Sequence, residues 1–476
     1  MKNYNRRKFI KTTTISAAAL TVASTLASCS DNNIESISKG KYMGGFSAPK
    51  LDTVRIAFIG LGARGSGHLR SLASLEGVEV VAISDLYEDS CTRSSKVASE
   101  IGKGERHNNI AQYWGEENKW ELMLEEIKPD AVFISTNWNN HAPMAIKSME
   151  SGAHAFVEVP IAVSLQEMWE IVDTSEKTQK HCMMLENVNY FRAEMMFLNM
   201  IRQNFIGDLQ HAEAAYIHDL RFQMNEENRG TGSWRTHHYA KSKGNLYPTH
   251  GLGPVAQYMN LARTEDTFKS IVSYSSPSMG RELYANKNFP KDHKWNKLSF
   301  ENGDLNTSII KTHLGRTILI QWDETSPRPY SRINLIQGTN GILTGHDIHN
   351  NLYKSNNPVK VAIDGGLKGA SDSSHKWVSG SDLNETIKKY EHPFWKRLNK
   401  KAKDSDHGGS DGIMLLRIVE CLQKGIPLDQ NVYEGCFWSS VTPLSAKSIK
   451  EDGSPQIFPD FTRGNWKTTK PLDIIS

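Results

Sequence analysis

Cysteine is scarce in this 476-residue chain. The five cysteines show no Cys-x-x-Cys spacing, and they are Cys29, Cys91, Cys182, Cys421 and Cys436. Zinc ribbons and other cysteine-based metal sites are therefore excluded. The last four could form one disulfide in an oxidising compartment, but we favour buried free thiols.

The chain also lacks an excess of charge of one sign. Its 56 Lys and Arg residues face 53 Asp and Glu residues, for a formal net charge of +3. So small an excess gives no reason to expect a nucleic-acid partner. No internal apolar run is long enough to span a bilayer, and no repeat period is visible. The length is sufficient for two sizeable cores.

The N-terminal residues have the features of a targeting signal. Arg6-Arg7 forms a twin-arginine pattern, a mild apolar run covers residues 15–27, and Leu26-Ala27-Ser28-Cys29 resembles the lipobox of bacterial lipoproteins. We therefore predict an export signal in residues 1–28 and a lipid anchor at Cys29. The product would be a membrane-anchored lipoprotein facing the periplasm or the cell surface. Residues 29–50 are rich in Ser, Asn and Gly and are interpreted as a tether.

A glycine-rich loop follows the first apolar run of the remaining chain. Residues 54–59 predict a buried strand, which leads directly into Gly60-Leu61-Gly62-Ala63-Arg64-Gly65 and then into a helix over residues 68–75. In this context Gly60, Gly62 and Gly65 permit a tight turn and close approach of a pyrophosphate to the helix N-terminus.

Asp85 ends a second predicted strand over residues 78–84, about 20 residues beyond the glycine loop. A carboxylate there binds ribose hydroxyls and repels a 2′-phosphate, so NAD is favoured over NADP. Arg64 complicates this choice, because an arginine in the loop could contact a phosphate.

Strands and helices go on alternating beyond Asp85. We predict strands over residues 130–136, 153–157 and 182–185 and helices over residues 142–150 and 165–178. This order indicates an α/β domain, a Rossmann-type doubly wound parallel sheet over residues 51–188. Ligands of such sheets lie at the C-terminal ends of the strands, so the loops after these strands should face the cofactor.

The pattern changes from residue 210 onward. Strand-like runs at 212–217, 268–274, 308–312, 317–322 and 331–337 surround one predicted helix near 252–261. They suggest a C-terminal α+β domain with a large, mostly antiparallel sheet. We assign residues 189–476 to this substrate domain.

Two sets of motifs carry a resemblance to known families. The first consists of the glycine loop, Ser84-Asp85, Glu158-x-Pro160 and Ile206-Gly207-Asp208-Leu209, and the second of three motifs, Trp138-Asn139-Asn140-His141, Glu158-Val159-Pro160 and the run from Tyr247 to Pro254. From about residue 52 onward the chain resembles the Gfo/Idh/MocA oxidoreductases. Dehydrogenases of that family normally carry Glu-Lys-Pro, whereas Val159 cannot donate a proton or hydrogen bond. The three motifs together are more similar to glycoside hydrolase family 109, whose characterised activity is NAD-dependent α-N-acetylgalactosaminidase.

The resemblance implies site residues position by position. It places NAD contacts at Ala63, Arg64, Asp85, Trp138, Asn139, Asn140, His141, Glu158, Val159 and Asn187. It places sugar contacts at Tyr216, Arg235, Tyr247, Pro248, Thr249, His250 and Tyr330. His250 is the candidate principal acid/base, because imidazole titrates near working pH. Tyr330 would deprotonate or hydrogen-bond a sugar hydroxyl, and Tyr247 would bridge sugar and nicotinamide.

The function implied is an exported glycosidase that oxidises and re-reduces its substrate on bound NAD, which other NAD-dependent glycosidases also do. The twin-arginine route carries folded proteins, so it suits an enzyme that retains its cofactor. Two alternatives stay open: an NAD-dependent sugar oxidoreductase, and a non-catalytic sugar-binding lipoprotein. Adjacent His237 and His238 point in different directions, so we expect no metal. A homo-oligomer is left open.

Overall fold

The computed structural model of the protein describes residues 40–103, 105–347, 351–354, 356–367, 375–402 and 405–472. The predicted export signal, the Cys29 anchor and residues 29–39 of the predicted tether lie outside these ranges. Within the described ranges, no helix has the length and hydrophobicity that a membrane crossing requires.

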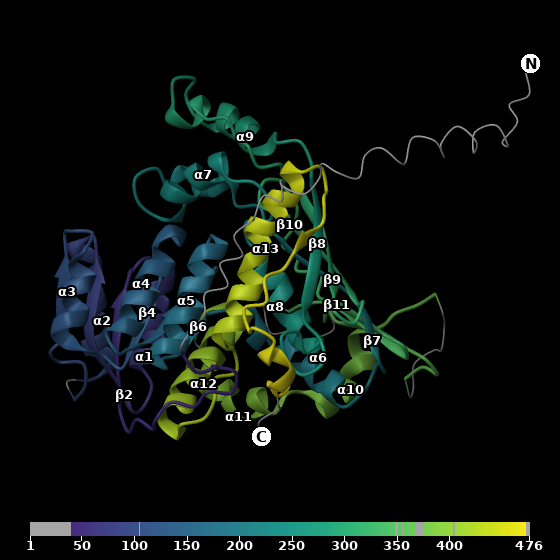
Figure 1. Cartoon of the computed structure of the whole chain (residues 1–476), viewed down its shortest axis with the longest axis horizontal. Coiled ribbons are helices and arrows are strands. Elements are labelled where there is room, and N and C mark those ends of the chain that lie inside the picture. Colours follow the sequence, from purple (N-terminus) through teal and green to yellow (C-terminus); the bar gives the residue numbers. More distant parts are fainter. Residues whose placement is uncertain are drawn as a thin grey trace, which may run out of the picture. The chain divides into compact units, whose positions relative to one another are not determined.

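A six-stranded parallel sheet forms the N-terminal part, in the order β3-β2-β1-β4-β5-β6 (Figure 1). This order confirms the predicted doubly wound sheet. Strands β1, β4, β5 and β6 are almost entirely buried, as expected for parallel strands covered on both faces. The strands are β1 (Val54–Ile59), β2 (Val78–Asp85), β3 (Ala111–Trp114), β4 (Ala131–Ile134), β5 (His154–Val157) and β6 (Cys182–Met184). The helices between them are α1 (Ala63–Ala73), α2 (Glu88–Ile101), α3 (Lys119–Ile127), α4 (Trp138–Glu150) and α5 (Leu165–Thr178).

Two of these helices show how local sequence sets the boundaries. Helix α5 has the predicted bounds because Ser164 and Glu167 form a capping box at its start. Helix α4 starts earlier than predicted. Residues 138–141 form its first turn instead of a loop, because the chain enters the helix directly from its N-cap residue Asn137, soon after β4 ends at Ile134.

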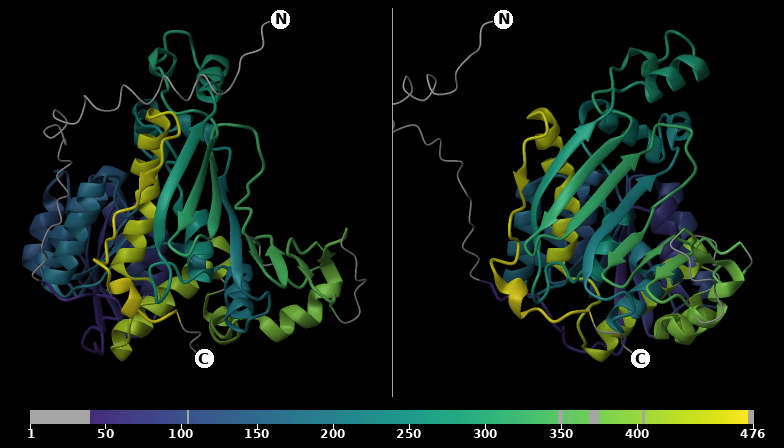
Figure 2. Two further views of the ribbon diagram at one scale, coloured as in Figure 1. Left: turned by 45° about the vertical axis from the view of Figure 1, so that its right-hand side comes forward. Right: turned by 90° about the vertical axis from the view of Figure 1, so that its right-hand side faces the viewer.

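The C-terminal part contains a nine-stranded sheet in the order β14-β13-β12-β11-β7-β10-β9-β8-β15 (Figure 2). Its pairings are antiparallel except for β7 with β10, so the predicted mostly antiparallel sheet is confirmed. The strands are β7 (Leu209–Ile217), β8 (Phe268–Ser275), β9 (Asn306–Thr312), β10 (Thr317–Asp323), β11 (Leu335–Gly338), β12 (Gly341–Thr344), β13 (Lys360–Ile363), β14 (Val378–Ser379) and β15 (Gln456–Ile457).

One predicted strand of this sheet is shorter than expected. Of the predicted run 331–337, only residues 335–337 lie in a strand, β11 (Leu335–Gly338). Ser331 makes an isolated bridge to Ile217, and Ile333 and Asn334 then take left-handed φ values of 59° and 53°. Left-handed residues cannot continue a strand, so the chain turns before β11 begins.

Helices from the C-terminal half hold the two sheets together. Helix α12 (Ser410–Lys424) packs against β1 and α1, and α13 (Val432–Lys450) packs against β8 and α5. The remaining helices are α6 (Arg192–Arg202), α7 (Thr231–Lys241), α8 (Thr249–Tyr258), α9 (Gly280–Asn288), α10 (Asn384–Tyr390) and α11 (Pro393–Ala402). Short 3₁₀ turns are η1 (Asn187–Tyr190), η2 (Arg221–Asn225), η3 (Lys294–Lys297), η4 (Gly380–Leu383), η5 (His407–Gly409) and η6 (Asn465–Thr468).

Residues 40–50, the end of the predicted tether, pack against this body. Met43 and Ala48 are buried, and the Met43 amide donates to the Tyr433 hydroxyl at 3.0 Å. The Lys41 amide donates to the Glu176 carbonyl at 3.1 Å. This segment is therefore a fixed strap that contacts the C-terminal end of α5 and the start of α13.

Candidate active site

The glycine loop leaves space where a phosphate would approach. Gly60 has φ +87°, and a Cβ on Gly65 would lie 1.9 Å from the Gly60 carbonyl oxygen, so both positions need glycine for the turn itself. A Cβ on Gly62 would meet nothing within 4 Å. Gly62 is also the N-cap of α1 and provides no side-chain cap. The helix N-terminus thus offers free amides and an open approach, which fits a dinucleotide pyrophosphate.

Asp85 is fixed at the end of β2 beside this loop. Its Oδ2 accepts a hydrogen bond from the Leu61 amide at 2.6 Å, and its Oδ1 accepts one from the Tyr87 amide at 3.0 Å. Both oxygens keep further lone pairs for ribose hydroxyls. The position and the negative charge suit the adenosine ribose of NAD.

The Arg64 side chain turns inward from the loop to two carboxylates. Its Nε donates to Glu158 at 2.8 Å and its Nη1 donates to Asp411 at 2.8 Å. His68 also donates to Glu158, at 2.6 Å. Burial alone would raise the pKa of Glu158, but the Arg64 charge and the His68 hydrogen bond outweigh it and hold that pKa below its usual value. Glu158 is therefore a carboxylate, and Arg64 is engaged in ion pairs away from the α1 N-terminus.

Asp411, at the start of α12, joins the C-terminal half to this cluster. Besides Arg64 it accepts from the Asn187 amide group at 2.6 Å, and His407 lies 3.0 Å from its Oδ2. Burial works against its ionisation, yet the Arg64 charge and the His407 hydrogen bond keep the pKa of Asp411 low. From the sequence, Asp411 is predicted only as part of a turn before a helix near the cleft, because nothing in its local sequence shows that α12 returns to the first sheet.

The motif at the start of α4 contributes the side chain of Trp138 to a group of aromatic residues, whereas the side chain of His141 points elsewhere. Trp138 is buried and contacts Trp234 at 5.1 Å and Tyr247 at 5.8 Å between ring centroids. His141 instead lies between the carbonyls of Pro160 and Thr136, at 2.7 and 3.2 Å, so its side chain braces two loops. Asn139 is exposed and Asn140 is half-buried at the same helix end.

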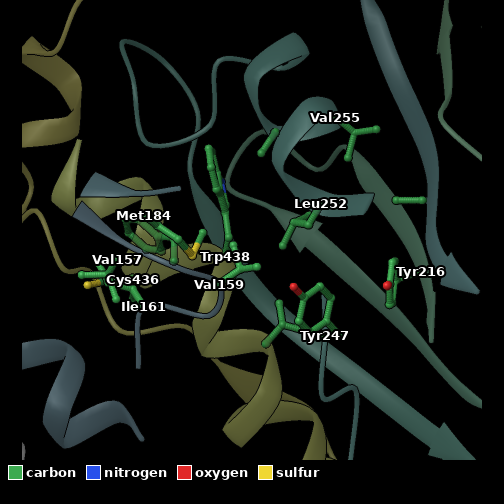
Figure 3. Packing of buried hydrophobic residues seen from close by; sticks show 14 of the residues in the cluster. Val157, Val159, Ile161, Met184, Tyr216, Tyr247, Leu252, Val255, Cys436 and Trp438 are labelled. Atoms are coloured by element: carbon green, nitrogen blue, oxygen red, sulfur yellow. The ribbon is translucent and has the colours of Figure 1, made fainter. Parts of the chain in front are cut away.

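Val159 lies in the same apolar cluster as Trp138, Tyr216, Tyr247 and Leu252 (Figure 3). It is 3% exposed and brings no polar atom on its side chain. Proton transfer in the adjoining site must therefore depend on other residues.

The predicted sugar-contact residues come together next to Val159 and Trp138. The Tyr216 ring lies 4.8 Å from Tyr247, 5.2 Å from His250 and 6.0 Å from Tyr330, and Tyr247 lies 4.8 Å from His250. These residues come from β7, the start of α8 and the loop after β10. Pro248 and Thr249, also predicted as sugar contacts, are buried at the N-cap and the first residue of α8.

Burial raises the pKa values of Tyr216, Tyr247 and Tyr330 above the usual value for tyrosine. All three hydroxyls therefore stay protonated at neutral pH and can donate hydrogen bonds. The Tyr216 hydroxyl lies 3.2 Å from Nδ1 of His218, a residue that the sequence analysis did not single out.

Arg235 of α7 reaches the same cluster. Its guanidinium carbon lies 4.8 Å from the centre of the Trp138 ring, 5.5 Å from Trp234 and 5.5 Å from Tyr247. Its Nε is buried and has no hydrogen-bond partner in the described structure. A cation among three aromatic rings with an unused donor is well placed to bind an oxygen of a ligand.

His250 has a carboxylate partner that the sequence did not reveal. Its Nδ1 lies 2.7 Å from Oε1 of Glu186, a fully buried residue that caps η1 just after β6. The same oxygen accepts from the Val188 amide at 3.1 Å. A carboxylate accepting from Nδ1–H fixes the tautomer in which Nε2 carries the lone pair. Nε2 of His250 is then the atom able to take a proton.

Two glycines of α8 allow this dyad to form. A Cβ on Gly251 would lie 2.6 Å from the Ala215 amide nitrogen, and one on Gly253 would lie 2.8 Å from Asn189 and 3.1 Å from Glu186. The helix can therefore press against both β7 and η1, which brings His250 to Glu186.

The two adjacent histidines of α7 face different rings. His237 lies 5.0 Å from Trp295, whereas His238 lies 5.0 Å from Trp138. Within the described residues, no group of three His, Cys, Asp or Glu side chains is arranged to hold a metal ion.

The fold and the glycine-loop site together define a protein with the nicotinamide-binding oxidoreductase fold. Residues 54–186 match the model of the oxidoreductase family with an NAD-binding Rossmann fold. Among solved structures, levoglucosan dehydrogenase in complex with NADH and levoglucosan is similar, with a TM-score of 0.62 and 16% identity. The match covers 86% of this chain and 100% of that one. At this identity, the likeness shows the fold alone.

The family follows from the C-terminal half and from full-length relatives. Residues 190–468 match the C-terminal domain of glycosyl hydrolase 109. Glycosyl hydrolase family 109 protein 1 of Akkermansia muciniphila is 58% identical over 91% of this chain and 87% of its own length. The family 109 protein of Shewanella pealeana is 49% identical over 99% of both chains. The chain belongs to glycosyl hydrolase family 109, so it is a glycoside hydrolase built on an oxidoreductase fold.

Proposed function

We propose that the protein hydrolyses terminal α-linked N-acetylgalactosaminides with NAD as a retained cofactor. The observation that carries the proposal is the His250–Glu186 dyad, surrounded by three protonated tyrosines next to the glycine-loop domain. Bound NAD would supply reversible oxidation at a sugar carbon, so that the anomeric substituent leaves by elimination, water adds, and the sugar is reduced again.

The chain's own residues supply binding and proton transfer in this proposal. The free amides at Gly62 and the Asp85 carboxylate would hold the pyrophosphate and the ribose. Arg235 would donate to the N-acetyl carbonyl or a hydroxyl, and the aromatic rings would pack on the sugar face. Nε2 of His250 would accept the carbon-bound proton beside the oxidised centre, and Tyr330 would exchange a proton with a sugar hydroxyl.

Export by the twin-arginine route and anchoring at Cys29 belong to the same proposal. NAD is scarce outside the cytoplasm, so an exported enzyme would have to fold around its cofactor first. A cycle without net redox change would then let the cofactor be used repeatedly.

The test incubates the purified full chain with an aryl α-N-acetylgalactosaminide and follows aglycone and NADH together. We expect aglycone release with no net NADH, and loss of release in the His250→Ala variant. Mass spectrometry of the denatured protein should detect released NAD.

Net NADH without aglycone would identify a sugar oxidoreductase, the class to which levoglucosan dehydrogenase, a protein of similar fold, belongs. Binding of unchanged sugar, with no effect of His250→Ala beyond affinity, would identify a non-catalytic binding protein. Either result would refute the proposal.

A further inference from the structure

A buried ion pair lies directly behind the Tyr330 hydroxyl. Nη1 of Arg332 donates to that hydroxyl oxygen at 2.8 Å, and Nη2 of Arg332 donates to Oε1 of Glu194 in α6 at 2.5 Å. Arg332 and Glu194 are each 1% exposed. Glu194, Arg332 and Tyr330 thus form a hydrogen-bonded chain that ends at the candidate sugar site.

Stability alone does not account for this pair. A buried ion pair loses its hydration, and apolar residues of similar volume often stabilise a fold equally well. Here hydrogen bonds within the protein replace only part of the lost hydration, because Nε of Arg332 and Oε2 of Glu194 have no hydrogen-bond partner in the described structure. The group of the candidate site that the pair touches is the Tyr330 hydroxyl.

The backbone around Arg332 is held in an unfavourable shape. Ile333, a β-branched residue, has φ 59°, and Asn334 has φ 53°. The turn is fixed on both sides, since the Arg332 carbonyl accepts from the Ala215 amide at 2.8 Å and Asn334 accepts from the Tyr258 hydroxyl at 3.1 Å. Strain of this kind persists where the surroundings enforce it, often at functional sites. Its effect here is to keep Arg332 directed inward.

We propose that Arg332 is a positioning residue for Tyr330, held in place by Glu194. Because the guanidinium donates to the phenol oxygen, the phenolic hydrogen is left to point at the sugar. When a proton passes between the Tyr330 oxygen and a sugar hydroxyl, one O–H bond breaks as the other forms, and the Arg332 charge stabilises the ionised phenol oxygen. This inference rests on the proposed function for the sugar.

Other groups that face Tyr330 do not supply that positive charge. The His218 ring lies 5.0 Å away and the His346 ring 5.8 Å away. Burial lowers the pKa of His218, and burial together with the Arg332 charge lowers the pKa of His346 to about 3. Both rings are therefore neutral near neutral pH. Tyr216, Glu186 and Glu194 also lie near Tyr330, and the two carboxylates oppose ionisation of the phenol.

The test measures the pKa of Tyr330 itself, independently of turnover. The full chain is labelled with fluorotyrosine, and the ¹⁹F resonance of Tyr330 is identified by its absence from Tyr330→Phe. Arg332→Met should raise the pKa of Tyr330 by about one unit or more, which is a tenfold change in ionisation, and Arg332→Lys should restore part of the shift. The double variant Arg332→Met/Glu194→Met leaves no unpaired charge, so it keeps the test available should the single variant not fold.

The same variants are assayed for aglycone release. We expect Arg332→Met to lower kcat about tenfold or more with little change in KM, and to move the alkaline limb of the pH profile upward. An unchanged pKa of Tyr330 in both Met variants would overturn the inference. A raised pKa in a protein that releases no aglycone even as wild type would support the Arg332–Tyr330 contact and contradict the glycosidase assignment instead.

Discussion

Replacing Glu186 with Gln should remove most of the activity without removing the fold. The carboxylate accepts from Nδ1 of His250 at 2.7 Å and so leaves Nε2 free to take a proton. The Gln amide can donate to Nδ1, which favours the opposite tautomer and blocks Nε2. General acid–base catalysis contributes about 10²–10⁴-fold, so we expect kcat to fall by about that factor. The lost charge-assisted hydrogen bond should lower the free energy of unfolding by about 1–3 kcal/mol.

The assay is aryl glycoside hydrolysis at saturating substrate, with thermal unfolding of the same samples. Glu213→Gln provides a matched control, because Glu213 lies 3.9 Å from His211 in a half-exposed pair on β7, outside the aromatic cluster. This control should keep wild-type kcat. An equal kcat for Glu186→Gln and wild type, in a folded protein, would refute the role assigned to the dyad.

Two further predictions concern stability and cofactor binding. Burial lowers the pKa of His181 to about 4 and that of His154 to about 2. Because the folded protein favours neutral histidine, the two residues leave the free energy of unfolding undiminished above the unfolded pKa near 6.5. Part of that free energy is lost as pH falls toward 4. Between pH 7 and pH 4, His181 alone should lower the free energy of unfolding by about 3 kcal/mol. In chemical unfolding experiments, the free energy of unfolding of His181→Gln should therefore fall less steeply with acid than that of wild type. Gly62→Ala should lower stability by less than about 1 kcal/mol yet weaken NAD binding about tenfold or more, because its methyl group enters the open approach to α1. Gly65→Ala should instead cost about 1–3 kcal/mol of stability through its clash with Gly60. Calorimetric titration of NAD beside thermal unfolding separates the two glycines, and equal NAD affinity for Gly62→Ala and wild type would contradict the assigned site.

The sequence predicts five of the six strands of the first sheet because their signals are local, but it misses β3, a half-exposed edge strand with no apolar run. Buried parallel strands appear as continuous apolar runs, and a capping box marks the first residue of α5. The turn at Ile333 and Asn334 could not be predicted in this way. Ile333 is a strong strand former, and the long-range hydrogen bonds around this turn override its propensity.

In the candidate site, too, the residues in local motifs could be predicted, whereas their distant partners could not. The motifs lead to His250, Tyr247 and the glycine loop, since each is recognisable within a few residues of chain. The partners of these residues are remote, with Glu186 64 positions from His250 and Asp411 347 positions from Arg64. Such pairings depend on how α8 and α12 pack, which no local pattern encodes.

In the proposed cycle the sugar is oxidised and reduced again within each turnover, and Nε2 of His250 removes the proton beside the oxidised carbon. Hydrolysis of an aryl α-N-acetylgalactosaminide in D₂O, followed by NMR of the released sugar, tests this step. We expect deuterium at C2 of that sugar. Complete retention of the original hydrogen at C2 would refute the proposed cycle.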